Sequence, residues 1–393
     1  MKKFFNFLIV MFPILSAYRG IGGLDFGSVI LFTAGMLCLC TNFKQFKLTN
    51  LPKGYGVFYI VAMIVSIVFI KSLQLRLSLF TINLVFACSF FDINLIIKYY
   101  LKTVKVCCAF FLIQELMYYF TGARISGILT FLPTIYGDAS TGIINRITTL
   151  NRSSSFFLEP SYFAQFLFPY VVYFLFSKKK ADIKKAVLVS FIMLVTKSGN
   201  GLILLLIIWC GWFFFSDIKT YQKCLLVLLV TLFLCGLLIV DNSLIFMLLE
   251  RMSELQSYGG EERHMSSGFI RFFRGYYLYD ELPMMNQLFG ANNNVVELYM
   301  SENIFFPDEE DKFLNGVQTI LVHNGLFILI LYIRHILLWG RQSSDIRIKI
   351  FIFCIIFLML GESYYLTSRL FFVTIFLFGL CHTQTTKSIK LYY

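Results

Sequence analysis

Two charged side chains stand at the start of an apolar segment, where a charge is costly unless it has a partner or a task. Arg152 and Glu159 lie in NRSSSFFLEPSYFAQF, residues 151–166. An arginine guanidinium can hold a phosphate or carboxylate through two parallel hydrogen bonds. Pro160 suits the first turn of a helix, so we expect a helix to begin near Glu159 after non-helical chain at 151–157. The positive end of that helix, with an arginine beside it, predicts a site for a phosphate-bearing ligand.

The role of Glu159 has three interpretations. A free carboxylate would repel a phosphate, so Glu159 either pairs with an arginine and orients it, or faces a sugar hydroxyl and accepts its proton. The plainer interpretation is a glutamate that caps the positive end of the helix.

Three further ionisable residues lie in or beside apolar runs: Glu115, Arg334 and Glu362. Charged groups inside membrane helices are expensive and commonly mark functional sites. Each of the three lies near the end of its run, however. Each can therefore extend to the polar interface, and the glutamates can instead pair with a nearby arginine.

The sequence offers no strong metal or nucleotide signature. The chain has four histidines, none of which pairs with another at ligand spacing. The acidic run 308–311 could hold a divalent cation, although a solvated acidic turn is the plainer interpretation. No Walker loop, Gly-x-Gly-x-x-Gly or cytoplasmic DxD motif is present, which argues against nucleotide-driven chemistry. The ten cysteines fall in or beside apolar runs and behave as small hydrophobes. We therefore expect neither a metal nor a cofactor.

The composition indicates a membrane protein. Of the 393 residues, 58% are hydrophobic and only 14% are charged, whereas soluble domains are about half apolar and about a quarter charged. A bilayer crossing needs about 20 apolar residues in a closed helix. We therefore expect one all-α integral membrane domain over residues 1–393. The formal charge of +12 comes from scattered lysines, which fits a topology signal better than a nucleic-acid surface.

Hydrophobic runs predict about 12 transmembrane helices. They lie near residues 4–18, 26–41, 55–70, 77–91, 106–120, 156–177, 186–196, 200–216, 224–240, 314–338, 350–364 and 370–382. The N-terminal MKKFFNFLIVMF lacks a convincing cleavage site, so we expect it to remain as the first helix. Two outer loops are long, at about 121–155 and 241–313. Aromatic residues at helical spacing in the second loop predict short helices on the membrane face.

Basic residues differ between the two sides of this topology. The inner segments are rich in lysine, which predicts that both termini are cytoplasmic. The outer cations are mostly arginine, at positions 19, 76, 124, 146, 152, 251, 263, 271, 274 and 369. Topology requires neither outer basic residues nor arginine in particular. The outer arginines therefore indicate recognition of phosphate or carboxylate groups.

Four short motifs occur in order along the chain. The first is Arg152-SSSFFL-Glu159-Pro160-Ser161-Tyr162-Phe163-Ala164, and the second is Thr196-Lys197-Ser198-Gly199-Asn200-Gly201. The third is Arg271 and Arg274 followed by Leu288-Phe289-Gly290, and the fourth is Asn315-(x)9-Gly325-Leu326. Together they resemble the O-antigen polymerase and ligase superfamily over about residues 124–335.

This resemblance implies a multi-pass enzyme of the bacterial inner membrane. Its substrates would be oligosaccharides on undecaprenyl pyrophosphate, as donor and acceptor, joined without a metal ion. The product would be lipopolysaccharide O-antigen, capsule or exopolysaccharide, with a flippase and a chain-length regulator as expected partners. Ligases carry a His-Asn pair where this chain has Leu314-Asn315, and His323 lies about two turns further on. We therefore expect a repeat-unit polymerase rather than a ligase. The third motif keeps only its first glycine, so the choice between Arg271 and Arg274 stays open.

The motifs and the arginine pattern together define the expected site. We expect catalytic residues at Arg152, Glu159, Arg271 and Arg274. We expect substrate-binding residues at Arg124, Arg146, Lys197, Tyr276, Tyr277, Asn315 and His323. The tyrosines could stack on sugar faces, and packing of an amphipathic loop helix is the plainer interpretation.

The main rival to a polymerase is a flippase or transporter of lipid-linked oligosaccharide. It would place its cations in a central cavity, usually with repeat symmetry between its halves. Here the arginines concentrate in two outer loops and the halves look unlike. An O-antigen ligase is a further possibility, as is a structural or partner-binding membrane protein.

Overall fold

The computed structural model describes residues 1–46, 55–70, 74–129, 131–135, 152–177, 180–216, 221, 272–306, 313–342 and 345–390. Regular structure in these segments is helical, and two isolated β-bridges join Tyr18 to Thr134 and Arg19 to Asp25. The helices are α1 (Lys2–Leu15), α2 (Phe26–Thr41), the 3-10 helix η1 (Phe43–Gln45), α3 (Tyr55–Val68), α4 (Leu75–Phe90), α5 (Ile93–Thr121), α7 (Pro160–Leu175), α8 (Lys180–Val195), α9 (Gly199–Phe215), α13 (Arg274–Glu281), α14 (Met284–Phe289), α15 (Asn293–Glu302), α16 (Gly316–Gln342), α17 (Ile346–Gly361) and α18 (Ser368–Lys390).

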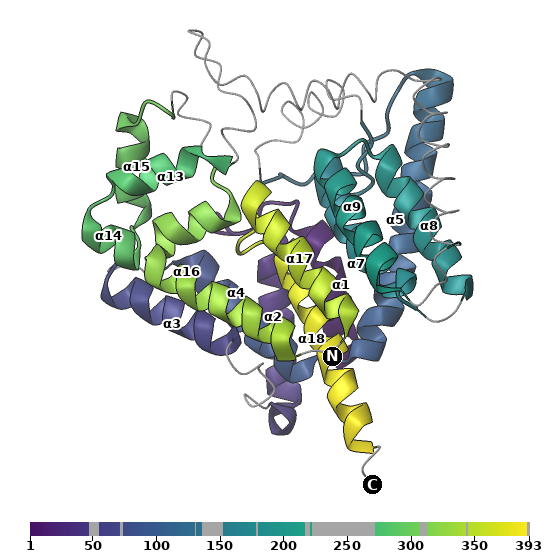
Figure 1. The fold of residues 1–393 in the computed structure, drawn as a ribbon, viewed down its shortest axis with the longest axis horizontal. Helices are drawn as coiled ribbons and strands as arrows, with labels where there is room; N and C mark the ends of the chain where they lie inside the picture. Colours follow the sequence, from purple (N-terminus) through teal and green to yellow (C-terminus); the bar gives the residue numbers. More distant parts are fainter. Residues whose placement is uncertain are drawn as a thin grey trace.

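The helices form a bundle with the short loop helices at one side. In Figure 1, α13, α14 and α15 lie together against α16, while α5, α7, α8 and α9 make up the opposite side. Helices α1, α17 and α18 run between these two groups, and α18 packs against α1, α4, α5, α7 and α17. The short helices at 274–302 confirm the helical part of the prediction for this segment, while its position on the outer membrane face stays a prediction.

Polar residues ahead of apolar runs begin several helices. Asp92 accepts a hydrogen bond from the backbone N–H of Asn94 at 3.1 Å and caps α5. Ser198 caps α9 in the same way. At α7, Pro160 takes the first helical position and Glu159 the cap position, and residues 152–159 are not helical. The predicted start of this helix is confirmed.

Each expected span except 224–240, which lies outside the described residues, overlaps a helix, although α5, α8 and α18 extend well beyond the expected bounds. Among the described helices, only Gly316–Arg341 is by itself long and apolar enough to cross a membrane. Helices α4 and α5 pass the same test only as one span, and they meet at 112°. Shorter apolar helices cover Phe26–Thr41, Phe58–Val68, Gly199–Phe215 and Ser368–Cys381. The all-helical class is therefore confirmed, while twelve crossings and their orientation stay a prediction.

Several helices present large apolar side chains outward. Ile60, Ile64 and Ile67 lie along one side of α3 and are each about half exposed. Other exposed residues of this kind are Leu112, Ile113, Leu116, Leu206, Phe214, Ile330, Leu337 and Phe353. Isolated apolar residues are ordinary on a protein surface, but continuous apolar faces indicate contact with another apolar phase.

One buried tyrosine completes the backbone hydrogen bonding of α7. Pro169 lies inside this helix and has no N–H, so the ladder is interrupted there. The Tyr100 hydroxyl, from α5, donates to the carbonyl of Phe166 at 2.6 Å and accepts from the N–H of Tyr170 at 3.0 Å. It thus joins the two groups that an undisturbed helix would pair directly.

Replacement of Tyr100 by phenylalanine should destabilise the protein. Both bonds would be lost, leaving a buried carbonyl and a buried N–H unsatisfied, at about 1–3 kcal/mol each. Thermal unfolding of the purified variant in detergent would measure the loss. Tyr99→Phe is the matched control, because Tyr99 is the neighbour on α5 and contacts Phe7 through its ring. Equal unfolding temperatures for the two variants would contradict the bridging role of Tyr100 in α7.

Candidate functional site

The ends of several helices meet at one end of the bundle. Asn200, at the start of α9, donates to the Glu362 carboxylate at the end of α17. The carbonyl of Glu362 accepts from the N–H of Gly316, at the start of α16, at 2.8 Å. Ser16, after α1, shares a 2.6 Å hydrogen bond with Ser368, at the start of α18. We call this region the polar end and define it by residues 152–165, 196–200 and 362–369.

A different set of helix ends meets elsewhere in the bundle. The Asn6 side chain, in the first turns of α1, bonds to the carbonyl of Phe90 at 3.2 Å and the N–H of Asp92 at 2.7 Å, between α4 and α5. Trp339, near the end of α16, donates to the sulfur of Cys381 in α18 at 3.2 Å. These contacts involve the helix ends that the expected topology places inside. The polar end collects those that it places outside.

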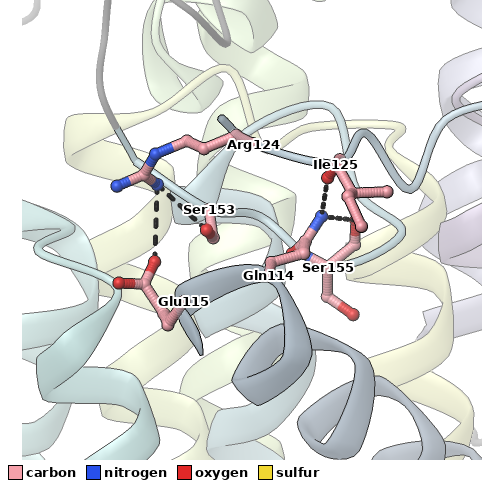
Figure 2. Close-up of polar contacts among 6 residues, drawn as sticks. All are labelled: Gln114, Glu115, Arg124, Ile125, Ser153 and Ser155. Carbon is pink, nitrogen blue, oxygen red and sulfur yellow. Dashed lines mark hydrogen bonds and ion pairs between the residues drawn. The ribbon is translucent and has the colours of Figure 1, made fainter. Parts of the chain in front are cut away.

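The non-helical segment 152–159 is held against α5. The N–H of Ser155 donates to Gln114 Oε1 at 2.8 Å, and Gln114 Nε2 donates to the carbonyl of Ile125 at 2.7 Å (Figure 2). Ser155 has a positive φ of 55°, and its hydroxyl donates to the carbonyl of Cys107 at 2.8 Å. The serines of the first motif thus supply hydrogen bonds where the chain is not helical.

Arg124 belongs to the same support. Its Nη1 lies 3.4 Å from Glu115 Oε1 and donates to Ser153 Oγ at 2.9 Å (Figure 2). Its Cζ lies 4.0 Å from the centre of the Tyr118 ring. The Glu115 carboxylate balances the charge of this guanidinium, and the Arg124 side chain is only 8% exposed. These contacts fit a residue that holds the chain in place better than one that receives a ligand.

Arg152 links the first motif to the second. Its Nη1 donates to the carbonyl of Lys197 at 3.0 Å, in the turn between α8 and α9. Lys197 has a positive φ of 51°, and Ser198 beside it caps α9. Two motifs that lie far apart in the sequence therefore meet at the polar end. Arg152 and Lys197 are both half-buried.

Glu159 lies at the cap position of α7 but does not cap it through its side chain. Its carboxylate accepts from the Ser161 hydroxyl at 3.1 Å, and its backbone carbonyl accepts from the N–H groups of Tyr162 and Phe163. The cap interpretation rests on a negative charge at the positive end of α7, and the structure places Glu159 at that position. The three interpretations of Glu159, as an orienting group, as a base and as a cap, therefore stay open.

The structure adds Arg369 to the candidate residues. Its Nη1 donates to Gln165 Oε1 at 2.6 Å, and its Cζ lies 3.6 Å from the centre of the Tyr162 ring. Arg369 is 8% exposed, and Gln165 is fully buried. Sequence reasoning counts Arg369 only as one of the outer arginines. The signal in the sequence is an arginine at the start of the last apolar run.

In the segment of short helices at 272–306, Arg274 lies in the interior. It is 1% exposed, donates to the carbonyl of Phe313 at 2.9 Å, and lies over the Phe306 ring at 4.3 Å. Tyr277 is exposed and packs on Phe305 with ring centres 4.6 Å apart. Tyr276 is half-buried, and burial raises the pKa of its hydroxyl, which keeps it neutral. Of the other expected site residues, Arg146 and Arg271 lie outside the described residues.

The third and fourth motifs meet through two glycines. Gly290 and Gly325 have positive φ values of 93° and 84°. A side chain at Gly290 would collide with the carbonyl of His323, and one at Gly325 with the carbonyl of Leu288. The N–H of Ala291 also donates to the carbonyl of Val322 at 2.9 Å. Only glycine permits this close backbone contact between the loop helices and α16.

Asn315 and His323 stand at different points of α16. The Asn315 side chain accepts from the N–H of Gln318 at 2.9 Å, and its own N–H donates to Gln318 Oε1 at 3.1 Å. This reciprocal pair begins the helix. The carbonyl of His323 accepts from Gln74 Nε2 at 3.0 Å, next to the kink at Gly325. The structure thus gives both residues local roles in shaping α16.

Within the described segments, no group of three histidine, cysteine, aspartate or glutamate side chains is placed to hold a metal ion. The acidic run 308–311 lies outside those segments. Comparison of the chain with protein-family models, with curated proteins and with solved structures found no match. The similarity to the polymerase and ligase superfamily therefore rests on the four motifs alone.

Replacement of Gly325 by alanine should loosen the loop helices from α16. A Cβ there meets backbone atoms and adopts an unfavourable φ, so we expect a lower unfolding temperature and faster proteolysis within 272–306. Gly340→Ala is the control on the same helix, because its Cβ would have only an ordinary contact with Ile352. Limited proteolysis with mass spectrometry would locate the cuts, and identical digestion of the two variants would overturn the proposed contact.

Proposed function

We propose that this chain is an integral membrane glycosyltransferase that polymerises oligosaccharide repeat units carried on undecaprenyl pyrophosphate. The observation that carries the proposal is the polar end. There Arg152, Glu159 and the start of α7 lie together, joined by Arg152 to the turn at Lys197. These residues belong to the first and second of the four motifs by which the sequence resembles the polymerase and ligase superfamily.

The outward apolar faces support a membrane location. Exposed isoleucine, leucine and phenylalanine side chains on α3, α5, α9, α16 and α17 suit a lipid phase. We infer about 12 crossings with both termini in the cytoplasm, because the lysine bias and the order of helix ends agree. The polar end then faces the periplasm of the bacterial inner membrane. Lipid-linked donor and acceptor glycans would reach it from the outer leaflet.

The reaction we infer is a displacement at the anomeric carbon of the donor. A hydroxyl of the terminal sugar of the acceptor forms the new glycosidic bond while the bond from that carbon to the lipid pyrophosphate breaks. The hydroxyl proton passes to a base, for which Glu159 is the candidate, and the pyrophosphate leaves with the electron pair. The protein must position two lipids and stabilise the charge that develops on the leaving group. Arg152 is our candidate for that stabilisation.

Arg274 now fits a supporting role better than a catalytic one. Its guanidinium lies in the loop interior against Phe306 and the carbonyl of Phe313. The proposal therefore keeps Arg271 as the candidate loop arginine. Arg124, balanced by Glu115, is likewise assigned to support. The product would be O-antigen, capsule or exopolysaccharide, according to the lipid-linked repeat that the cell makes. A flippase and a chain-length regulator are the partners that we propose.

Replacement of Arg152 by alanine should reduce polymer growth by about 10²- to 10³-fold, the usual effect of removing one donor to a developing anion. Single lipid-linked repeats should then accumulate on the outer leaflet of cells that make the glycan. Arg334→Ala is the control, because Arg334 is exposed toward the other end of α16. Accumulation on the inner leaflet would favour a transporter and contradict the polymerase.

Polymerisation by the purified chain should continue when a chelator removes divalent cations, because arginine supplies the positive charge. The assay would use the chain in lipid bilayers with one defined lipid-linked repeat and would display products as a ladder on a gel. A ladder that forms only after a divalent cation is restored would exclude the metal-independent mechanism.

A further inference from the structure

Arg369 is a buried cation that lacks a balancing anion in the described part of the chain. It is 8% exposed, and its contacts are the Gln165 oxygen and the rings of Tyr162 and Tyr364. None of these groups carries a negative charge. A buried charge without a partner is costly, which makes such a residue a candidate for binding an oppositely charged ligand.

The guanidinium has donors to spare. Arginine offers five N–H groups, and one of them bonds to Gln165 Oε1. Arg369 Cζ lies over the Tyr162 ring, 3.6 Å from its centre, the arrangement in which a guanidinium plane stacks on an aromatic face. The N–H bonds point outward within that plane. The ring therefore covers one face and Gln165 takes one edge, which leaves other edge donors for a planar or tetrahedral oxyanion.

Gln165 provides a second, independent observation. It is fully buried, and its Nε2 has no hydrogen-bond partner in the described part of the chain. Its orientation is fixed, because only the amide oxygen can accept from Arg369. A buried amide N–H without an acceptor is destabilising. A ligand oxygen that accepted from both Gln165 Nε2 and Arg369 would give the amide an acceptor and the guanidinium a negative charge.

The position of the pair favours more than one negative charge on the ligand. Gln165 lies just beyond the first turn of α7, and Arg369 is the second residue of α18. Both helices begin here, so their positive ends add to the charge of the arginine. A cation at a helix start is itself unfavourable, and an anion would offset that cost. A phosphate group satisfies these conditions better than a single carboxylate.

We propose that Arg369 and Gln165 form a buried phosphate subsite between α7 and α18, which receives the headgroup of a pyrophosphate-linked lipid. The proposal rests on the proposed function, because it names a binding position within the same polar end. The polymerase mechanism then has two cationic contacts on the start of α7, Arg152 on the approach segment and Arg369 above Tyr162.

Gln165→Glu is the decisive variant. This substitution replaces the amide NH₂ by an oxygen and keeps the shape of the side chain. It places a carboxylate next to Arg369 and removes the Nε2 donor. We expect an unfolding temperature at or above that of the unmodified chain, and binding of undecaprenyl pyrophosphate weakened about 10- to 100-fold, as for losing a charged hydrogen bond. Arg369→Lys keeps the positive charge but loses the paired N–H donors of the planar guanidinium. It should therefore weaken binding by less than Arg369→Gln. Arg334→Gln is the control and should bind normally.

Binding would be measured with the full chain in nanodiscs, by the shift in unfolding temperature on adding undecaprenyl pyrophosphate or, separately, inorganic pyrophosphate. A shift with both identifies the free anion as sufficient, and a shift with the lipid alone identifies the membrane-held headgroup; either supports the subsite. Unweakened binding by Gln165→Glu overturns it, as does competition by glucuronate but not by pyrophosphate.

This binding assay needs no polymerisation, so the two proposals can fail separately. A chain that binds pyrophosphate through Arg369 but makes no polymer would contradict only the polymerase. Normal polymerisation and normal binding by Gln165→Glu would contradict only the subsite.

Discussion

The arrangement of the polar end depends on the hydrogen bonds between Gln114 and Ser155. They hold the non-helical segment against α5, and α7 can then begin at Pro160. Because α7 begins there, Arg152 lies beside the turn at Lys197. A bundle of apolar helices has few ways to hold polar chain at its end, and here side chains supply the partners that a helix would have supplied.

Four arginines, Arg124, Arg274, Arg369 and Arg152, differ in the groups that the structure places against them. Arg124 lies next to Glu115, and Arg274 rests on a ring and a carbonyl inside the loop fold. Arg369 is buried with a neutral amide and two rings, and Arg152 is half-buried beside a backbone carbonyl. Residue type alone cannot separate these cases. The partner decides whether an arginine supports the fold or is suited to an anionic ligand.

Local patterns predict the local structure well. The start of α7 follows from Pro160, and the short helices at 274–302 follow from aromatic spacing. The pairing of Arg369 with Gln165 could not be predicted, because it joins residues 204 positions apart with no shared pattern. The contact between Gly290 and Gly325 is equally hidden, although each glycine belongs to one of the four motifs. Sequence reasoning finds residues suited to chemistry, whereas their partners depend on the packing of distant helices.

In the proposed mechanism, bond formation and release of lipid pyrophosphate are one event at the polar end. The most direct measurement is the stoichiometry of the two in proteoliposomes that contain the purified chain and a lipid-linked repeat in the leaflet next to that end. The mechanism predicts one undecaprenyl pyrophosphate released for each glycosidic bond formed. Movement of the lipid-linked repeat to the opposite leaflet, without any release of pyrophosphate or growth of the glycan, would contradict it.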